Sequence, residues 1–405
     1  MRYYTKAKGE KMNSLLHTPE GVRDILGDEC QKKNYVMKAL TSLLFSYGYD
    51  QVETPMFEFT DTYSESYGST PERDMFRFFD RDGNTLALRP DFTPSIARLT
   101  ARFFSDTKET IRLCYQGNVF KNRHSLRGEM SEQTQVGAEM IGDSSIESDA
   151  EMISIIVNGF LSAGLSKFQI SIGHADIFNG LIEAAGFSSD EEKDVHDFVS
   201  NKNFFGLSEY LTQKKVDQDL QSLFSLLSKI FMNPDEWKDS LEMARNYPPV
   251  YNALSHLYQM NELLSAYGVE DYVSFDLGLV RSLNYYTGII FAGYTLGSGK
   301  PIVTGGRYDS LLGHFGADRP AIGFAILVDE LLLAIDRQHI ELPIENAKIL
   351  LLYPRNQVKS AIRKADSLRK AGNRVLMHSY NDTDHKNKLC IKYASFTIME
   401  TGGEK

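Results

Sequence analysis

The pattern of apolar and polar residues in the first half of the chain predicts one long helix followed by short strands. Apolar residues recur at helical spacing over 28–47, and Gly48 follows where a helix C-terminal glycine is expected. Residues 133–141 alternate, which directs Gln135 and Glu139 to the face opposite Val136. Strand patterns are expected at 50–59, 75–79, 85–88, 111–120, 133–141 and 168–172, and a helix at 92–103.

The second half of the chain predicts a block of helices and then a return to mixed structure. No glycine occurs between Leu207 and Tyr267, and Pro234 stands where a helix would begin, so a helical insertion is expected at about 190–270. Strands are expected at 273–275, 289–294 and 301–304, and a helix at about 326–335. Beyond Pro343, strand, helix and strand patterns follow one another at 348–353, 358–371 and 374–378.

These elements predict an α+β protein with an antiparallel sheet and flanking helices. We expect a main domain at 1–338, which contains the helical insertion, and a small C-terminal α/β domain at 345–405.

Composition narrows the classes of function. The chain has 405 residues, 42% of them hydrophobic, and a net charge of -10, which argues against a protein held mainly by nucleic-acid phosphates. Three cysteines without CxxC spacing predict neither a disulfide framework nor a zinc site. We find no signal-like or membrane-spanning pattern and expect a cytoplasmic protein that starts at Met1 or Met12.

Three polar clusters are candidates for binding chemistry, and each also has an ordinary structural interpretation. Asp91 and Thr93 follow a strand and could simply cap a helix. Gln135 and Glu139 flank a glycine that could clear space for a ligand, although an exposed sheet face would show the same alternation. The third cluster, at 279–309, contains tyrosines that could belong to the core and a Gly-Gly-Arg sequence that could form a hairpin bend.

The combination of these clusters resembles the catalytic core of histidyl-tRNA synthetases over residues 17–338, and this implies a class II aminoacyl-tRNA synthetase-like fold. The matching segments are TPEGVRDIL at 18–26, GYDQVETPMFE at 48–58, LRPDFT at 88–93, QVGAEMIG at 135–142, LVRSLNYYTG at 279–288, GGRYDSL at 305–311 and PAIGFAI at 320–326. The stretches RSLNYY and GGRYD are the ones typical of histidine-specific synthetases.

The resemblance implies a pocket for free histidine. It assigns the substrate ammonium to Asp91, the carboxylate to Arg281, and contacts with the amino acid and its imidazole to the pair Gln135 and Glu139. The full set of implied histidine-binding residues is Asp91, Thr93, Lys121, Gln135, Glu139, Arg281, Tyr285 and Tyr286.

The nucleotide-binding half departs from the synthetase pattern at three positions. Lys121 stands where the family has an arginine on the α-phosphate, and Gln133 replaces the phenylalanine that stacks on adenine. Glu330 replaces the arginine on the γ-phosphate, so a triphosphate would be repelled there.

An amino-acid pocket without these groups resembles the regulatory subunits of ATP phosphoribosyltransferase, which are synthetase paralogues in histidine biosynthesis. That resemblance implies no catalytic residues, no metal and no cofactor, with histidine as the regulatory ligand. It also implies a dimer, and a hetero-octamer of four plus four chains with the short-form catalytic subunit, without nucleic acid or membrane.

Two other functions stay open at this point: a divergent histidyl-tRNA synthetase that activates histidine with ATP, and a free-standing amino-acid sensor or RNA-binding module. The sequence also leaves open whether histidine binds in the synthetase-like pocket or at a subunit interface. It does not identify the surface that contacts the partner or the role of the helical insertion.

Overall fold

The computed structural model describes residues 16–63, 70–122, 130–230, 234–280, 286–344 and 348–401. The chain divides into two compact units, residues 1–342 and residues 343–405.

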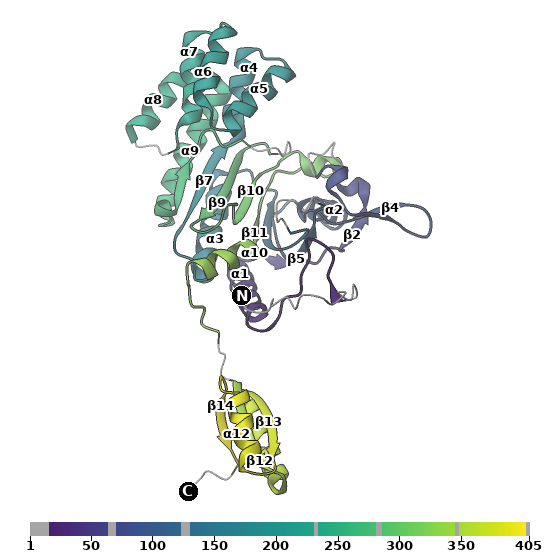
Figure 1. The fold of residues 1–405 in the computed structure, drawn as a ribbon. Coiled ribbons are helices and arrows are strands. Elements are labelled where there is room, and N and C mark those ends of the chain that lie inside the picture. Colours follow the sequence, from purple (N-terminus) through teal and green to yellow (C-terminus); the bar gives the residue numbers. More distant parts are fainter. Residues whose placement is uncertain are drawn as a thin grey trace, which may run out of the picture. The chain divides into compact units, whose positions relative to one another are not determined.

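An eight-stranded sheet forms the centre of the larger unit (Figure 1). Its strands, in spatial order, are β1 (Asp50–Gln51), β5 (Ile111–Phe120), β6 (Glu132–Ile141), β11 (Ala321–Leu327), β10 (Val303–Arg307), β9 (Ile289–Thr295), β7 (Phe168–His174) and β8 (Val273–Phe275). Only the edge pairs β1–β5 and β7–β8 are parallel, so the predicted antiparallel class II sheet is confirmed.

One face of this sheet carries the main hydrophobic core. The helices α1 (Gly27–Ser46), α3 (Ile146–Ser162) and α10 (Val328–Arg337) pack there against one another or against the strands. The side chains of Val136, Ala138 and Met140 in β6 point into this core, as the alternation predicted.

The opposite face carries a smaller core and leaves room for a pocket. The helix α2 (Thr93–Phe103) packs there against the short helix η8 (Leu311–Phe315). Beside α2 lies a separate three-stranded antiparallel sheet of β2 (Phe57–Phe59), β4 (Thr85–Leu88) and β3 (Arg77–Phe79), with the short helices η2 (Thr60–Tyr63) and η4 (Glu72–Asp74).

The helical insertion predicted at about 190–270 is helical in the part of it that the structure describes. The helix α4 (Ala175–Ala185) precedes it, and its own elements are α5 (Ser189–Ser200), α6 (Phe204–Gln213), α7 (Gln218–Phe224), η6 (Ser225–Ser228), α8 (Pro234–Ala244), α9 (Pro248–Ala266) and η7 (Glu270–Tyr272). The long helix α9 packs against α3 and α4, so these helices share one continuous core with the sheet.

The helix expected at about 326–335 is shifted in the structure. Ile326 and Leu327 end the strand β11, and the helix α10 begins only at Val328. This strand was missed because the sequence AIGFAIL is buried on both faces and shows no alternation. The helices α3 and α4 were also not predicted.

The C-terminal unit is a parallel three-stranded sheet with one helix on each face. In chain order it contains β12 (Lys348–Pro354), η9 (Arg355–Gln357), α11 (Val358–Lys370), β13 (Arg374–Tyr380), α12 (Thr383–Lys392) and β14 (Thr397–Glu400). Leu351 of the central strand packs against α11, whereas Leu350 and Leu352 pack against α12.

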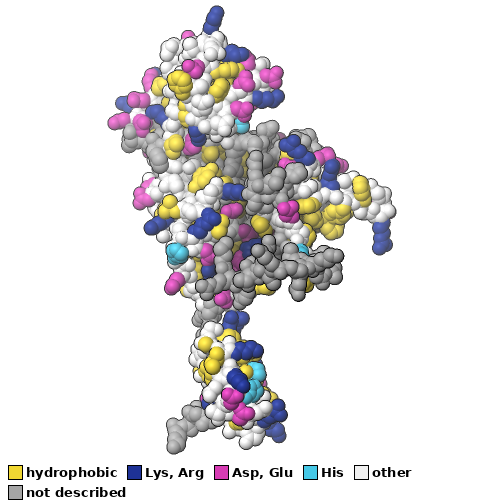
Figure 2. All heavy atoms as spheres, in the orientation of Figure 1, with side chains coloured by type: hydrophobic (Ala, Val, Ile, Leu, Met, Phe, Trp, Pro, Cys, Tyr) yellow, Lys and Arg dark blue, Asp and Glu magenta, His cyan; other side chains and the backbone are white. Residues whose placement is uncertain are grey.

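The charge of the chain is unevenly distributed. Residues 343–405 contain 12 Lys and Arg against six Asp and Glu, a formal charge of +6 within a chain of net charge -10. Figure 2 shows Lys and Arg side chains on the visible face of this unit. Across the described ranges, we find no helix with both the length and the apolar content that a bilayer crossing requires.

Candidate amino-acid-binding site

A pocket opens on the α2 side of the large sheet, where β6, β10 and β11 lie next to one another. Five of the eight predicted residues line it: Asp91, Thr93, Lys121, Gln135 and Tyr286. The rest of the lining comes from Thr304, Gly305, Tyr308, Gly323, Phe324 and Ala325. The structure therefore brings together residues that are up to 234 positions apart in the chain, from Asp91 to Ala325.

Two predicted residues, Arg281 and Tyr285, lie outside the described residues. The eighth, Glu139, lies behind the pocket wall, and its side chain is almost completely buried, with 1% exposed. Its carboxyl group accepts hydrogen bonds from Thr93 Oγ1 at 2.9 Å and from the Tyr308 hydroxyl at 2.6 Å. Glu139 thus orients two side chains that do line the pocket.

Glycines provide the space for this arrangement. A Cβ atom at Gly323 would collide with the carboxyl group of Glu139. A Cβ atom at Gly137 would collide with the hydroxyl of Tyr115, so the space beside this glycine is filled by a tyrosine and not by a ligand. The interpretation of Gly137 as clearance for a ligand was therefore wrong.

The turn that carries Asp91 and Thr93 is fixed by a buried arginine. Arg89 donates to the carbonyl oxygens of Thr54 at 2.9 Å and Asn118 at 2.8 Å. Its guanidinium also stacks over the ring of Phe92, with 4.0 Å to the ring centroid. These contacts connect the turn to the neighbouring strand β5 and hold Asp91 and Thr93 at the edge of the pocket.

The helix-cap interpretation of Asp91 receives little support. The N-cap residue of α2 is Phe92, which makes no side-chain cap bond, and from the residues that the structure describes Asp91 accepts only a long 3.4 Å contact, from the Thr93 amide. A strong cap would accept a shorter bond. The carboxylate of Asp91 is thus available for a ligand.

The pocket contains an unsatisfied acceptor. Gln135 Oε1 is buried and has no hydrogen-bond donor among the described residues. A buried carbonyl oxygen without a donor is costly unless a ligand supplies one. Gln135 and Asp91 both line the pocket, so an ammonium group, which has three donors and a positive charge, matches them.

Burial changes the charge state of Glu139. Loss of hydration raises the pKa of this carboxyl group to about 8, against the lowering effect of hydrogen bonds from Tyr308, Thr93 and Tyr115. Glu139 therefore holds a proton at neutral pH in the folded protein, and an unfolded glutamate has lost it.

We predict that Glu139→Gln makes the protein less sensitive to rising pH. Between the ordinary pKa of 4.5 and the folded value of about 8, the folded wild type binds a proton that the unfolded chain releases, so its stability falls as pH rises. Between pH 5.5 and 7 the variant should gain about 2 kcal/mol relative to wild type. Urea unfolding at the two pH values measures this gain. An equal stability difference at both values would contradict a protonated Glu139.

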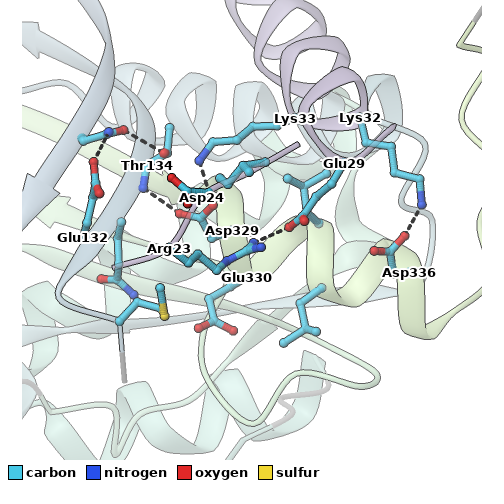
Figure 3. Close-up of a pocket in the computed structure, with 16 residues that line it drawn as sticks. Arg23, Asp24, Glu29, Lys32, Lys33, Glu132, Thr134, Asp329, Glu330 and Asp336 are labelled. Atoms are coloured by element: carbon cyan, nitrogen blue, oxygen red, sulfur yellow. Dashed lines mark hydrogen bonds and ion pairs between the residues drawn. The ribbon is translucent and has the colours of Figure 1, made fainter. Parts of the chain in front are cut away.

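A second, larger pocket lies between α1, α10 and the first residues of β6 (Figure 3). We call it the acidic pocket because six carboxylates and three cations line it. The carboxylates are Asp24, Glu29, Glu132, Asp329, Glu330 and Asp336, and the cations are Arg23, Lys32 and Lys33. Two of the positions where nucleotide-binding groups are replaced, Gln133 and Glu330, belong to its lining.

Each cation of the acidic pocket is paired with a carboxylate. Arg23 pairs with Glu29, Lys32 with Asp336, and Lys33 with Asp329 at 2.9 Å. Asp329 also accepts a hydrogen bond from the Thr134 amide at 2.7 Å. Asp329 and Glu330 place two negative charges in the first turn of α10, where an anion would otherwise be favoured. The acidic pocket thus disfavours a polyphosphate.

Sequence reasoning missed two tyrosines that organise the site. Tyr308 lies in the GGRYD segment, so the quoted motif itself held the signal. Tyr115 stacks on Phe92 with ring centroids 4.2 Å apart and places its hydroxyl 3.4 Å from Glu139. Nothing in its local sequence distinguishes it from an ordinary strand tyrosine.

Comparisons with known proteins agree on one family. A family model described as histidyl-tRNA synthetase matches residues 21–331. The ATP phosphoribosyltransferase regulatory subunit of Ruminiclostridium cellulolyticum is 38% identical over 88% of this chain and 84% of the relative. That of Acetivibrio thermocellus is also 38% identical, over 88% of this chain and 85% of the relative.

Solved structures show the same relationship. A crystal structure from Bacillus halodurans, described as an ATP phosphoribosyltransferase regulatory subunit/histidyl-tRNA synthetase, has a TM-score of 0.82 and 30% identity, and covers 96% of this chain and 99% of its own. Histidyl-tRNA synthetase from Nostoc sp. has a TM-score of 0.78 at 21% identity over 94% and 90% of the two chains, which shows the shared fold alone. The chain belongs to the ATP phosphoribosyltransferase regulatory subunits, a family with the histidyl-tRNA synthetase fold.

Proposed function

We propose that this chain is the non-catalytic regulatory subunit that acts with the short-form ATP phosphoribosyltransferase in the cytoplasm, at the first step of histidine biosynthesis. In this proposal histidine binds in the pocket of Asp91 and Gln135 and inhibits the partner. The single observation that carries it is the buried acceptor of Gln135, which needs a donor. The relatives' name, regulatory subunit, supports the assignment of the role.

The chemistry of the acidic pocket supports the absence of adenylation. Histidine activation requires cations that neutralise the transferred nucleotide's phosphates. Around the acidic pocket, every cation that the structure describes is already paired with a carboxylate. An enzyme would have to break these pairs and overcome the charge of Glu330.

Regulation of a partner by histidine requires a coupling free energy between two sites, typically about 1–3 kcal/mol. Because such coupling is reciprocal, binding of the catalytic subunit must change the histidine affinity of this chain by the same factor.

Reconstitution tests the proposal. The short catalytic subunit from the same organism is assayed for phosphoribosyl transfer with and without this chain, and with and without histidine. We expect the chain to change the rate of transfer and histidine to inhibit only the reconstituted complex. A catalytic subunit that neither binds the chain nor responds to it would contradict the proposal.

The synthetase alternative has its own assay. A divergent histidyl-tRNA synthetase would exchange pyrophosphate into ATP when histidine is present. We expect no histidine-dependent exchange from the purified chain. Histidine-dependent exchange by the wild-type chain that is lost in the Gln135→Leu variant would favour the synthetase function.

We further propose that the chain forms dimers within a hetero-octamer of four plus four chains. The outer face of the small sheet, which we call the aromatic face, carries Phe57, Phe59 and Phe78 with 52%, 58% and 38% of each residue exposed. Figure 2 shows hydrophobic side chains gathered over this region. Contiguous exposed apolar patches of this kind favour a protein interface, and we assign this one to a second copy.

We predict that Phe59→Lys weakens the dimer. Burying a lysine charge against a second aromatic face should raise the dimer dissociation constant at least about tenfold. Sedimentation velocity over a dilution series measures it. Phe103→Lys is the matched control, because Phe103 is at least as exposed, at 66%, but lies on α2 outside the aromatic face. Equal sedimentation of the two variants would remove the aromatic face from the interface.

A further inference from the structure

A largely buried network of hydrogen-bonded side chains connects the helix α9 to the large sheet. His256 of α9 has its Nε2 atom 2.8 Å from Oδ2 of Asp149 in α3. Asp149 is completely buried, with 0% exposed, and its Oδ1 accepts from Arg307 Nε at 3.0 Å and from Nη2 at 2.6 Å. The network thus links the side chain of His256 to that of Asp149, and Asp149 in turn to Arg307 of β10.

Arg307 lies between the elements that carry two pocket tyrosines. Tyr308 follows it directly in sequence, and the backbone oxygen of Arg307 accepts from the Thr287 amide at 2.8 Å. The Arg307 side chain also packs against Gly288, where a Cβ atom would lie 3.0 Å from its Cδ. Thr287 and Gly288 follow Tyr286, the other pocket tyrosine. Displacement of Arg307 would therefore shift both segments that carry the pocket tyrosines Tyr286 and Tyr308.

We propose that His256 is a positioning residue for the amino-acid pocket. It holds Asp149, Asp149 holds Arg307, and Arg307 fixes the positions of Tyr286 and Tyr308. This inference rests on the proposed function, because it takes histidine as the ligand of the pocket. It gives the helical segment around α9 a role in histidine affinity, although His256 does not line the pocket.

The bonding of Asp149 explains why His256 matters. In the described part of the chain, the only donor to Asp149 Oδ2 is His256, and both bonds to Oδ1 come from Arg307. Without His256 a buried carboxylate oxygen loses its donor. The carboxylate then keeps its bonds from Arg307, but the fixed orientation in which Oδ1 accepts from both Nε and Nη2 of the Arg307 guanidinium is lost.

The alternative is that His256 only stabilises the fold. Arg307 has further anchors that do not involve Asp149, since its guanidinium donates to Ser148 Oγ at 2.9 Å and to the Asp143 carbonyl at 2.9 Å. These bonds keep the fold in place when Asp149 shifts, so the two roles are separable. A purely structural residue would change the unfolding temperature without changing the affinity of the folded protein.

Calorimetric titration of histidine into the full-length chain tests the proposal. His256→Ala should weaken histidine binding by about tenfold. His256→Gln, whose amide can donate to Asp149, should restore most of that affinity. Leu257→Ala is the matched control, because Leu257 is a buried neighbour on α9 that packs in the core and has no polar side-chain atom that could hydrogen-bond to this network. It should lower the unfolding temperature and leave the affinity within about twofold.

A double-mutant cycle adds a second measurement. Tyr308→Phe should weaken histidine binding. In a protein that already carries Tyr308→Phe, His256→Ala should weaken histidine binding less than it does in the wild type, because His256 acts on the pocket through Tyr308.

Two results would overturn the inference: unchanged affinity in His256→Ala at a temperature where the variant is folded, or an equal loss of affinity in Leu257→Ala. A wild-type chain that binds no histidine, alone or in the reconstituted complex, would instead overturn the proposed function and the inference with it.

Discussion

Asp149→Ala should lower the free energy of unfolding by about 3 kcal/mol, the lower end of the range for a broken buried ion pair, because the buried Arg307 loses its closest counter-ion and keeps the pair with Asp309 at 3.3 Å. Arg307 is only 5% exposed, and its Nε and Nη2 atoms both donate to Oδ1 of Asp149. The closest negative charge and two hydrogen bonds are lost together, and His256 loses its acceptor as well.

Chemical denaturation followed by tryptophan fluorescence measures this loss, since Trp237 is buried in the same core. Asp366→Ala is the control, because Asp366 pairs with Arg369 on the surface at 3.2 Å and both side chains are about half exposed. Its effect should stay below about 1 kcal/mol. An Asp149→Ala loss as small as that of the control would show that the buried network contributes little to stability.

Gln135→Leu should weaken histidine binding by roughly 10- to 100-fold, the value expected when a hydrogen bond to a charged group is lost. Gln135 Oε1 is the buried acceptor that an ammonium group would satisfy. Leucine fills a similar volume and accepts no hydrogen bond, so the pocket keeps its shape and loses one contact.

Titration calorimetry of the isolated chain measures the change. Gln133→Leu is the matched control, since Gln133 lies two residues earlier on β6 and lines the acidic pocket instead. Its histidine affinity should stay within about twofold of wild type. Equal losses in the two variants would show that strand distortion, and not the lost acceptor, is responsible.

Much of the fold could be predicted from local sequence pattern. The helix α1 and the strand β5 were placed within one residue of their observed bounds, because one shows clear helical spacing and the other is a strand bounded by loops. The strand β6 showed its two faces through alternation. The strand β11 did not, because burial on both faces removes the polar positions that reveal the period.

The sequence predicted only those residues of the candidate site that belong to recognisable motifs. Asp91 and Gln135 were assigned by resemblance, and the structure places both in one pocket. The burial of Glu139 behind Gly323 depends on strand pairing, which no local pattern specifies. The contact of His256 with Asp149 joins residues 107 positions apart, so it could be found only from the fold.

Net charge was also an incomplete guide. The acidic total of -10 concealed the positive charge of residues 343–405. On α11, Lys359, Arg363 and Lys370 project opposite the buried Ala361, at positions that helical periodicity places on one ridge. Summation over the whole chain hides such a segregation of charge between two units.

Histidine inhibition of the reconstituted complex, compared between wild type and Gln135→Leu, tests the central claim most directly. We expect equal rates of phosphoribosyl transfer without histidine, inhibition of the wild-type complex by histidine, and a shift of the Gln135→Leu curve to roughly 10- to 100-fold higher histidine concentration. Inhibition of both complexes at the same histidine concentration would contradict the account, because histidine would then act at a site other than this pocket.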